Sequence, residues 1–108
     1  MDGDALHDLV MNRLRAGLDA AYGSRLARVV LYGSRARGDA SPDSDYDVAV
    51  FLRDLIDRAA ELERLADLGA DILYDTGELV HAMPYSAAAY DDPDMPLMHE
   101  IRREGLDL

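Results

Sequence analysis

The sequence has 108 residues, of which 49% are hydrophobic, so it can bury the core of one domain but not of two. Its 22 acidic and 11 basic residues give a formal net charge of −11, which opposes tight non-specific binding to a nucleic-acid backbone. Every basic residue is arginine and cysteine is absent, which excludes a lysine nucleophile, a phosphate-loop lysine, a disulfide and a cysteine-based zinc site. We therefore expect residues 1–108 to form a single domain.

The sequence predicts neither a membrane-spanning segment nor a signal peptide. It contains no apolar run of about 18 residues, and its start lacks the charged and apolar regions of a secretory signal. We therefore expect a cytoplasmic protein that does not associate with a membrane.

The first predicted element is an amphipathic helix over residues 4–22, in which apolar residues recur at helical spacing and Asp4 is available as a cap. The recurring residues are Leu6, Leu9, Val10, Leu14, Leu18 and Ala21. The next run, residues 27–32, is almost wholly apolar, is rich in β-branched residues and stops at Gly33. This pattern predicts a buried strand that leads into a turn.

The turn at Gly33 has the features of a phosphate site. Glycine lets the backbone bend and lets a ligand approach closely. Ser34 is placed to cap the short segment 35–37, and the free backbone N–H groups at such a start attract phosphate. Arg35 and Arg37 flank the turn, where they can pair with the outer phosphates of a nucleotide. We therefore predict that Gly33, Ser34, Arg35 and Arg37 bind a nucleotide.

Two carboxylates follow this turn, at the start of a second strand. The composition of residues 38–44 predicts a surface loop, and the apolar run within residues 45–52 predicts a strand. Residues two apart on a strand point to the same side, about 6.5 to 7 Å apart, so Asp45 and Asp47 are expected to project together. Because two clustered acids repel each other unless a cation is bound, we predict that they hold Mg²⁺ or Mn²⁺. The metal would in turn hold a nucleoside triphosphate.

A crossover helix, a third strand and a closing helix complete the predicted fold. A second apolar stripe predicts a helix that starts near Asp54 and ends at Gly77. The stripe comprises Leu55, Ala59, Leu62, Ala66 and Ala70, and the charges outside it are Glu61, Glu63, Arg64 and Asp67. Residues 78–85 predict a strand ended by Pro84 and Ser86, and residues 95–104 predict the closing helix. Strands that alternate with helices predict an α/β protein, a small mixed sheet flanked by helices.

Two motifs in this chain resemble those of the minimal nucleotidyltransferases (MNT), a family of the DNA polymerase β superfamily. They are Leu31-Tyr32-Gly33-Ser34-Arg35-Ala36-Arg37-Gly38-Asp39 and Ser44-Asp45-Tyr46-Asp47-Val48. The match covers residues 27–52, and its combination of motif and spacing is far more specific than a lone glycine motif. The resemblance implies a polymerase β-like core in which an antiparallel third strand lies beside the Asp-x-Asp strand.

Members of this family usually supply a third acidic residue from that next strand, and no acid stands out there in this chain. His81 is the polar residue in the middle of a strand over 78–85. Its imidazole can accept a proton but is a poor Mg²⁺ ligand. If residues 71–74 formed a short strand, Asp71 would be the third carboxylate, but a helix is favoured for that stretch. His81, Asp71 or neither can therefore be the third site group, and we place His81 beside Asp45 and Asp47 in the predicted catalytic set.

The resemblance also implies a partner, because small stand-alone members of this family are often antitoxins. Their toxins are helical ribonucleases, which they silence by attaching AMP from ATP. The resemblance thus implies a Mg²⁺-dependent adenylyltransferase that acts on a hydroxyl of a partner protein. The missing third acid leaves a second hypothesis open, in which a catalytically weak domain neutralises its partner by docking. In either case so small a domain is expected to borrow its acceptor surface from a partner protein, from a second copy in a homodimer, or from both.

Overall fold

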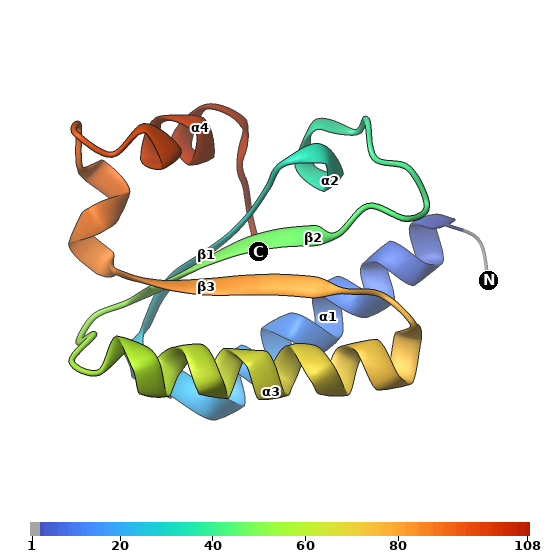
Figure 1. The fold of residues 1–108 in the computed structure, drawn as a ribbon, viewed down its shortest axis with the longest axis horizontal. Helices are drawn as coiled ribbons and strands as arrows, with labels where there is room; N and C mark the ends of the chain where they lie inside the picture. The colour runs from blue at the N-terminus through green and yellow to red at the C-terminus, as the bar shows by residue number, and fades with distance from the viewer. Residues whose placement is uncertain (1–2) are drawn as a thin grey trace.

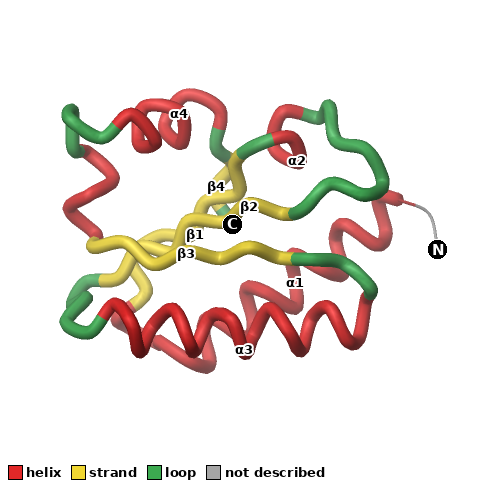
Figure 2. The backbone as a smooth tube through the Cα atoms, in the orientation of Figure 1, coloured by secondary structure: helices red, strands yellow, loops and turns green. Residues whose placement is uncertain are grey.

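Four strands form one mixed sheet between two layers of helices (Figure 1). The computed structural model describes residues 3–108. The elements in chain order are α1 (Gly3–Tyr22), η1 (Gly23–Arg25), β1 (Leu26–Tyr32), α2 (Ser34–Arg37), β2 (Tyr46–Leu52), α3 (Arg58–Thr76), β3 (Val80–Ser86), η2 (Ala87–Asp91), α4 (Pro96–Glu104) and β4 (Leu106–Asp107). Helices α1 and α3 cover one face of the sheet, and η2 and α4 cover the other (Figure 2). The predicted α/β class and the mixed sheet flanked by helices are confirmed.

The strand order is β3-β2-β1-β4. β1 pairs with β2 antiparallel, whereas β2 pairs with β3 parallel. The antiparallel third strand that the family resemblance implied is therefore wrong. The reason is α3, because a helix between two strands carries the chain back along the sheet, so that β3 starts at the same end as β2. The short β4, which pairs with Val30 and Leu31 at the other edge, was not predicted.

The two central strands are buried on both faces and divide the core in two. Residues of β1 and β2 that point to one side pack against α1 and α3, and include Val29, Leu31, Tyr46 and Val48. Residues that point to the other side, including Val30, Ala49 and Phe51, pack against Met98 and Ile101 of α4. Because side chains alternate along a strand, Asp47 lies on the α4 side of the sheet, between Tyr46 and Val48 in sequence.

Helix α1 agrees closely with its prediction, although Asp4 lies within the first turn and is not its cap. Its buried residues include Val10, Leu14 and Leu18, whereas Leu9 is 39% exposed. Within the described part of the chain, neither α1 nor any other helix has the length and apolar character needed to cross a bilayer.

Helix α3 ends where it was predicted to end but starts later and buries a different face. Gly77 adopts φ 77°, and its N–H group donates to the Leu73 carbonyl oxygen at 2.8 Å, which ends the helix. The buried residues are Glu61, Leu65, Gly69 and Ile72, so the alanine-rich stripe is wrong, as is the outward position of Glu61. Both stripes have helical spacing, but burying Leu65 and Ile72 removes more apolar surface from water than burying alanines does.

The start of α3 is fixed by Asp57 and not by Asp54. The side chain of Asp57 accepts a hydrogen bond from the backbone N–H of Ala60 at 3.1 Å. We expect Asp57→Ala to lower the free energy of unfolding by about 1 kcal/mol, because it leaves this N–H without its cap. Asp67→Ala, on the exposed side of the same helix, should leave stability unchanged or slightly raised. Urea denaturation of both variants checks this, and equal losses would contradict it.

Strand β3 forms one edge of the sheet and contains Pro84 within it, although Pro84 was expected to end the strand. Proline is tolerated in an edge strand when its nitrogen faces away from the sheet, because no neighbouring strand then needs a hydrogen bond from the N–H group that proline lacks. The carbonyl oxygen of Pro84 accepts a hydrogen bond from Nη1 of Arg58, at the start of α3.

Candidate active site

The turn between β1 and α2 brings Asp47 against the backbone of Gly33. Gly33 has φ 76° and ψ −159°, a region open almost only to glycine. A Cβ atom at residue 33 would lie 2.6 Å from Oδ2 of Asp47, so a side chain there would collide with the carboxylate. Asp47 also stands opposite Tyr32 in the β1–β2 register. The second predicted metal ligand therefore lies directly beside the predicted phosphate turn.

Asp45, His81 and Arg37 lie within electrostatic reach of Asp47. Asp45 is exposed and precedes β2 by one residue, and His81 is the register partner of Asp47 across β2 and β3. Burial raises the pKa of Asp47, and the negative charge of Asp45 raises it further, whereas His81 and Arg37 lower it. The structure thus brings together the two predicted metal ligands, the predicted third catalytic residue and one predicted phosphate-binding arginine.

Ser34 does not cap the short helix, contrary to its predicted role. Helix α2 begins at Ser34, and Gly33 is its N-cap residue without a side-chain hydrogen bond. The Gly33 carbonyl oxygen accepts from the N–H groups of Ala36 and Arg37 at 3.1 and 3.0 Å. The Ser34 side chain, partly exposed next to the turn, is therefore not occupied in holding the helix start.

The two arginines of α2 take opposite directions. Arg37 forms ion pairs with Asp39 and Glu104, each at 3.2 Å, and with Glu100 of α4 at 3.9 Å. Arg35 instead contacts the loop before Asp45 and pairs with Glu78 at 3.5 Å. Only Arg37 therefore lies on the Asp47 side of the sheet.

Strand β3, from which relatives usually supply a third acid, contains no acidic residue. Asp71 is exposed on α3, which agrees with the favoured helix and removes it from the site. Among residues 3–108, no three or more His, Cys, Asp or Glu side chains come together in a group that could hold a metal. His81, exposed on the edge strand, therefore remains the nearest polar counterpart on β3.

Tyr32, which stands opposite Asp47, and Glu100, which lies within electrostatic reach of Tyr32, were not singled out from the sequence. Burial raises the pKa of Tyr32 to about 12, and the neighbouring Tyr85, Asp47 and Glu100 add to the rise. Tyr32 had a signal, since it immediately precedes Gly33 in the predicted strand. Glu100 had none, because α4 reaches this side of the sheet only in the folded chain.

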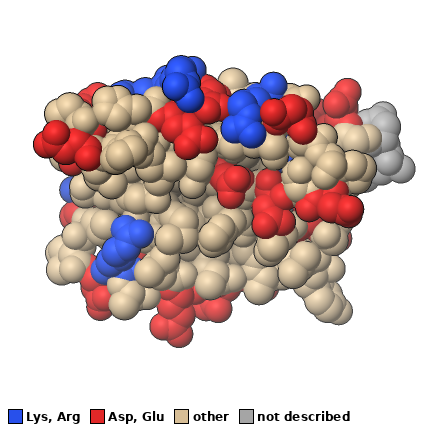
Figure 3. Space-filling view, turned by 45° about the horizontal axis from the view of Figure 1, so that its top comes forward, with Lys and Arg blue, Asp and Glu red and all other residues tan. Residues whose placement is uncertain are grey.

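A cavity of about 260 Å³ lies on the other side of the sheet, next to Tyr46. Its lining residues are Gly3, Leu6, Arg35, Ala40, Ser41, Pro42, Tyr46 and Glu78. Asp45 and Asp47 do not line it; Asp45 is exposed and Asp47 is partly buried. Acidic side chains are widespread over the face drawn in Figure 3, in keeping with the net charge of −11.

The donor set of the acid pair suits a divalent metal ion bound together with a nucleotide. Mg²⁺ is usually held by one or two carboxylates, with substrate phosphates and water completing its oxygen ligands. Asp45 and Asp47 supply two carboxylates. The negative charge of Asp45 raises the pKa of Asp47, and a bound cation would relieve this repulsion. A site of this kind needs no third protein ligand to bind metal.

The raised pKa of Asp47 makes a prediction about stability. The folded state holds the Asp47 proton more tightly than the unfolded chain, so ionising Asp47 destabilises the metal-free fold as pH rises above the ordinary aspartate value of about 4. We therefore expect Asp47→Asn, in the presence of a chelator, to unfold at a higher temperature than the unaltered protein at neutral pH. Thermal denaturation at several pH values should show this advantage shrinking below pH of about 4. An advantage independent of pH would contradict the prediction.

Solved structures with similar folds are minimal nucleotidyltransferases and toxin–antitoxin complexes. One is described as a candidate minimal nucleotidyltransferase, with 29% identity, a TM-score of 0.63, and coverage of 100% of this chain and 97% of the other. Another is a toxin–antitoxin with AMP-PNP, with 20% identity, a TM-score of 0.66, and coverage of 89% and 69%. A third contains a tri-AMPylated HEPN toxin from Shewanella oneidensis with its MNT antitoxin, with 16% identity, a TM-score of 0.57, and coverage of 93% and 69%. The fold is that of the polymerase β-like nucleotidyltransferases.

The sequence leads to the same class by a separate comparison. The family model for the nucleotidyltransferase domain matches residues 11–89, well over half of the chain. No curated protein matches significantly. The chain therefore belongs to the nucleotidyltransferase domain family, and its resemblance to the minimal nucleotidyltransferases is confirmed.

Proposed function

We propose that this protein transfers AMP from ATP to a hydroxyl group of a partner protein, and that it acts as the antitoxin of a helical ribonuclease toxin. The observation that carries the proposal is the contact of the Asp47 carboxylate with the Gly33 turn, with Asp45 within electrostatic reach. The likeness in fold to MNT antitoxins supports the choice of partner, and AMP-PNP in a similar structure supports the choice of nucleotide.

In this proposal each residue of the site has a separate task. Asp45 and Asp47 hold Mg²⁺ or Mn²⁺, which supplies positive charge to the phosphates when bound. The Gly33 turn, the Ser34 hydroxyl and Arg37 orient the triphosphate. The acceptor oxygen bonds to the α-phosphorus, the bond from that phosphorus to the bridging oxygen breaks, and pyrophosphate leaves. An imidazole nitrogen of His81 accepts the proton of the acceptor hydroxyl.

The proposal is tested with the product of the adjacent reading frame as the acceptor. The two proteins are purified together and incubated with Mg²⁺ and ATP labelled at either the α- or the γ-phosphate. Nucleotidyl transfer labels the acceptor from α-labelled ATP alone, and intact mass should show the addition of AMP. Label transferred from the γ-phosphate, or no labelling from either, contradicts the proposal.

The lack of a third acid keeps the docking module as a second candidate function. Among residues 3–108 the acid pair is not part of a larger group of metal ligands, so metal and nucleotide binding without efficient turnover is chemically reasonable. The two candidates differ in what Asp45→Asn does in cells that express the partner. A docking module with this substitution still protects the cells, whereas an enzyme does not.

A further inference from the structure

Arg35 follows Ser34 in sequence, yet its side chain extends to the loop that carries Asp45. Its Nε and Nη2 atoms donate to the carbonyl oxygen of Ser44 at 3.2 and 2.9 Å. Nη2 also lies 3.4 Å from the carbonyl oxygen of Pro42. Since Ser44 immediately precedes Asp45 in sequence, one guanidinium group connects the phosphate turn to the peptide that positions the first metal ligand.

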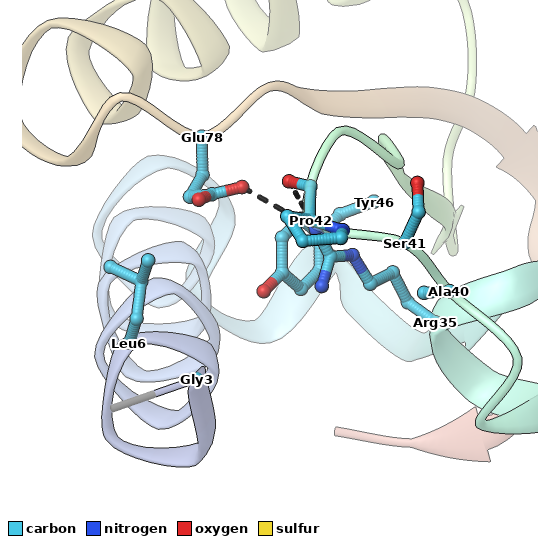
Figure 4. Close-up of a pocket in the computed structure, with 8 residues that line it drawn as sticks. All are labelled: Gly3, Leu6, Arg35, Ala40, Ser41, Pro42, Tyr46 and Glu78. Carbon is cyan, nitrogen blue, oxygen red and sulfur yellow. Dashed lines mark hydrogen bonds and ion pairs between the residues drawn. The ribbon is translucent and has the colours of Figure 1, made fainter. Parts of the chain in front are cut away.

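The same guanidinium group contacts two further segments. Nη2 pairs with Oε2 of Glu78 at 3.5 Å, and the two side chains are only 16% and 17% exposed. The guanidinium carbon lies 4.4 Å from the ring centre of Tyr46, the residue between the two acids. The backbone N–H of Tyr46 donates to the carbonyl oxygen of Leu79 at 2.9 Å, which joins the start of β2 to the segment before β3. Figure 4 shows Arg35 and Glu78 meeting beside Tyr46 and the 40–42 loop.

These contacts need the shape of arginine and not only its charge. A planar guanidinium can donate from two nitrogens to one carbonyl while its flat face lies on an aromatic ring, and a lysine ammonium cannot reproduce both. Charge-assisted hydrogen bonds of this kind are stronger than neutral ones. Glu78 depends on the same group, because an acid so little exposed is costly to leave unpaired.

We propose that Arg35 is a positioning residue, which holds Asp45 in place for metal binding through the Ser44 carbonyl group and does not bind the phosphates of the nucleotide. This inference rests on the proposed function for the purpose of the metal, and it replaces the phosphate contact expected from the sequence. The two arginines of α2 then have different roles. Arg37 faces the nucleotide, and Arg35 holds the loop before Asp45 from the opposite side of β2.

The experiment compares Arg35→Lys with Arg15→Lys. Arg15 is the matched control, because it also donates to a backbone carbonyl, that of Leu108 at 2.8 Å, but lies on α1 and outside the site. Mn²⁺ affinity is measured by electron paramagnetic resonance without nucleotide, and amide hydrogen exchange is followed over residues 38–47. We expect Arg35→Lys to weaken Mn²⁺ binding about tenfold and to speed exchange in this segment, and Arg15→Lys to do neither.

Transfer kinetics separate this role from that of a phosphate ligand. At saturating Mn²⁺, a positioning residue lowers kcat with little change in the KM for ATP, whereas a phosphate ligand mainly raises that KM.

Glu78→Gln is the second variant if Arg35→Lys fails to fold. It weakens the ion pair with Arg35, keeps the shape of the side chain, and should shift Mn²⁺ affinity in the same direction. Unchanged Mn²⁺ affinity in the folded Arg35→Lys variant or in its Glu78→Gln substitute, or no Mn²⁺ binding by the unaltered protein, overturns the inference. Loss of Mn²⁺ affinity in a protein that transfers no nucleotide would overturn the proposed function alone.

Discussion

Replacing Asp47 with asparagine should lower the rate of the proposed AMP transfer by about a hundredfold or more, because it removes the charge of a proposed metal ligand that lies against the Gly33 turn. Asp45→Asn should have a comparable effect, since the two carboxylates would share the metal. The fold should survive both changes, because Asn is nearly the same size as Asp. The measurement is the initial rate of partner labelling from α-labelled ATP at saturating Mg²⁺.

Asp43→Asn is the matched control for these variants. Asp43 lies in the same loop, two residues before Asp45, and is exposed, so its replacement changes the charge of the loop without removing a proposed ligand. We expect it to keep nearly full activity. If Asp43→Asn were as damaging as Asp47→Asn, the general acidity of this loop and not a specific metal site would explain the loss. Full activity of Asp47→Asn would remove the proposed mechanism.

Gly33→Ala should damage both stability and metal binding. A side chain at residue 33 forces a backbone conformation that L-residues rarely adopt, and its Cβ would lie 2.6 Å from Oδ2 of Asp47. We expect a loss of about 2 kcal/mol or more in the free energy of unfolding. Because the carboxylate must move to relieve the collision, we also expect the Mn²⁺ affinity to fall.

Gly38→Ala separates the two causes of this damage. Gly38 also has a positive φ, of 84°, but a Cβ atom there would meet nothing within 4 Å. Its replacement should therefore cost about 1 kcal/mol through backbone strain and leave Mn²⁺ binding unchanged. Urea denaturation and Mn²⁺ titration of both variants test the pair. Equal Mn²⁺ affinities for the two variants would show that the approach of Asp47 to Gly33 has no part in the site.

The centre of the site could be predicted because its geometry is local. An apolar run, a glycine, a short loop and two alternating acids specify a strand, a turn and a second strand, and together these bring Asp47 to Gly33. Burial on both faces of β1 and β2 follows in the same way from their nearly continuous apolar character. The direction of β3 could also have been derived, because the predicted helix between the strands favours a parallel pair.

Other features depend on residues that meet only in the folded chain. Arg35 pairs with Glu78 and Arg37 pairs with Glu104, and both acids are distant from α2 in sequence. The buried face of α3 was ambiguous because two stripes had helical spacing, and only packing against α1 and the sheet selects Leu65 and Ile72. β4 comprises two residues, Leu106 and Asp107, which is too few for an alternating pattern to indicate a strand.

The proline of β3 has a consequence for how this domain can associate with other proteins. A new strand added alongside β3 would need outward-facing donors and acceptors. At Pro84 the donor does not exist, and the acceptor is already taken by Arg58. This border of the sheet is therefore a poor template for extension by another chain. A partner protein or a second copy of the domain should accordingly not be held by strand pairing along β3, and side-chain contacts at this border can vary in sequence without altering the sheet.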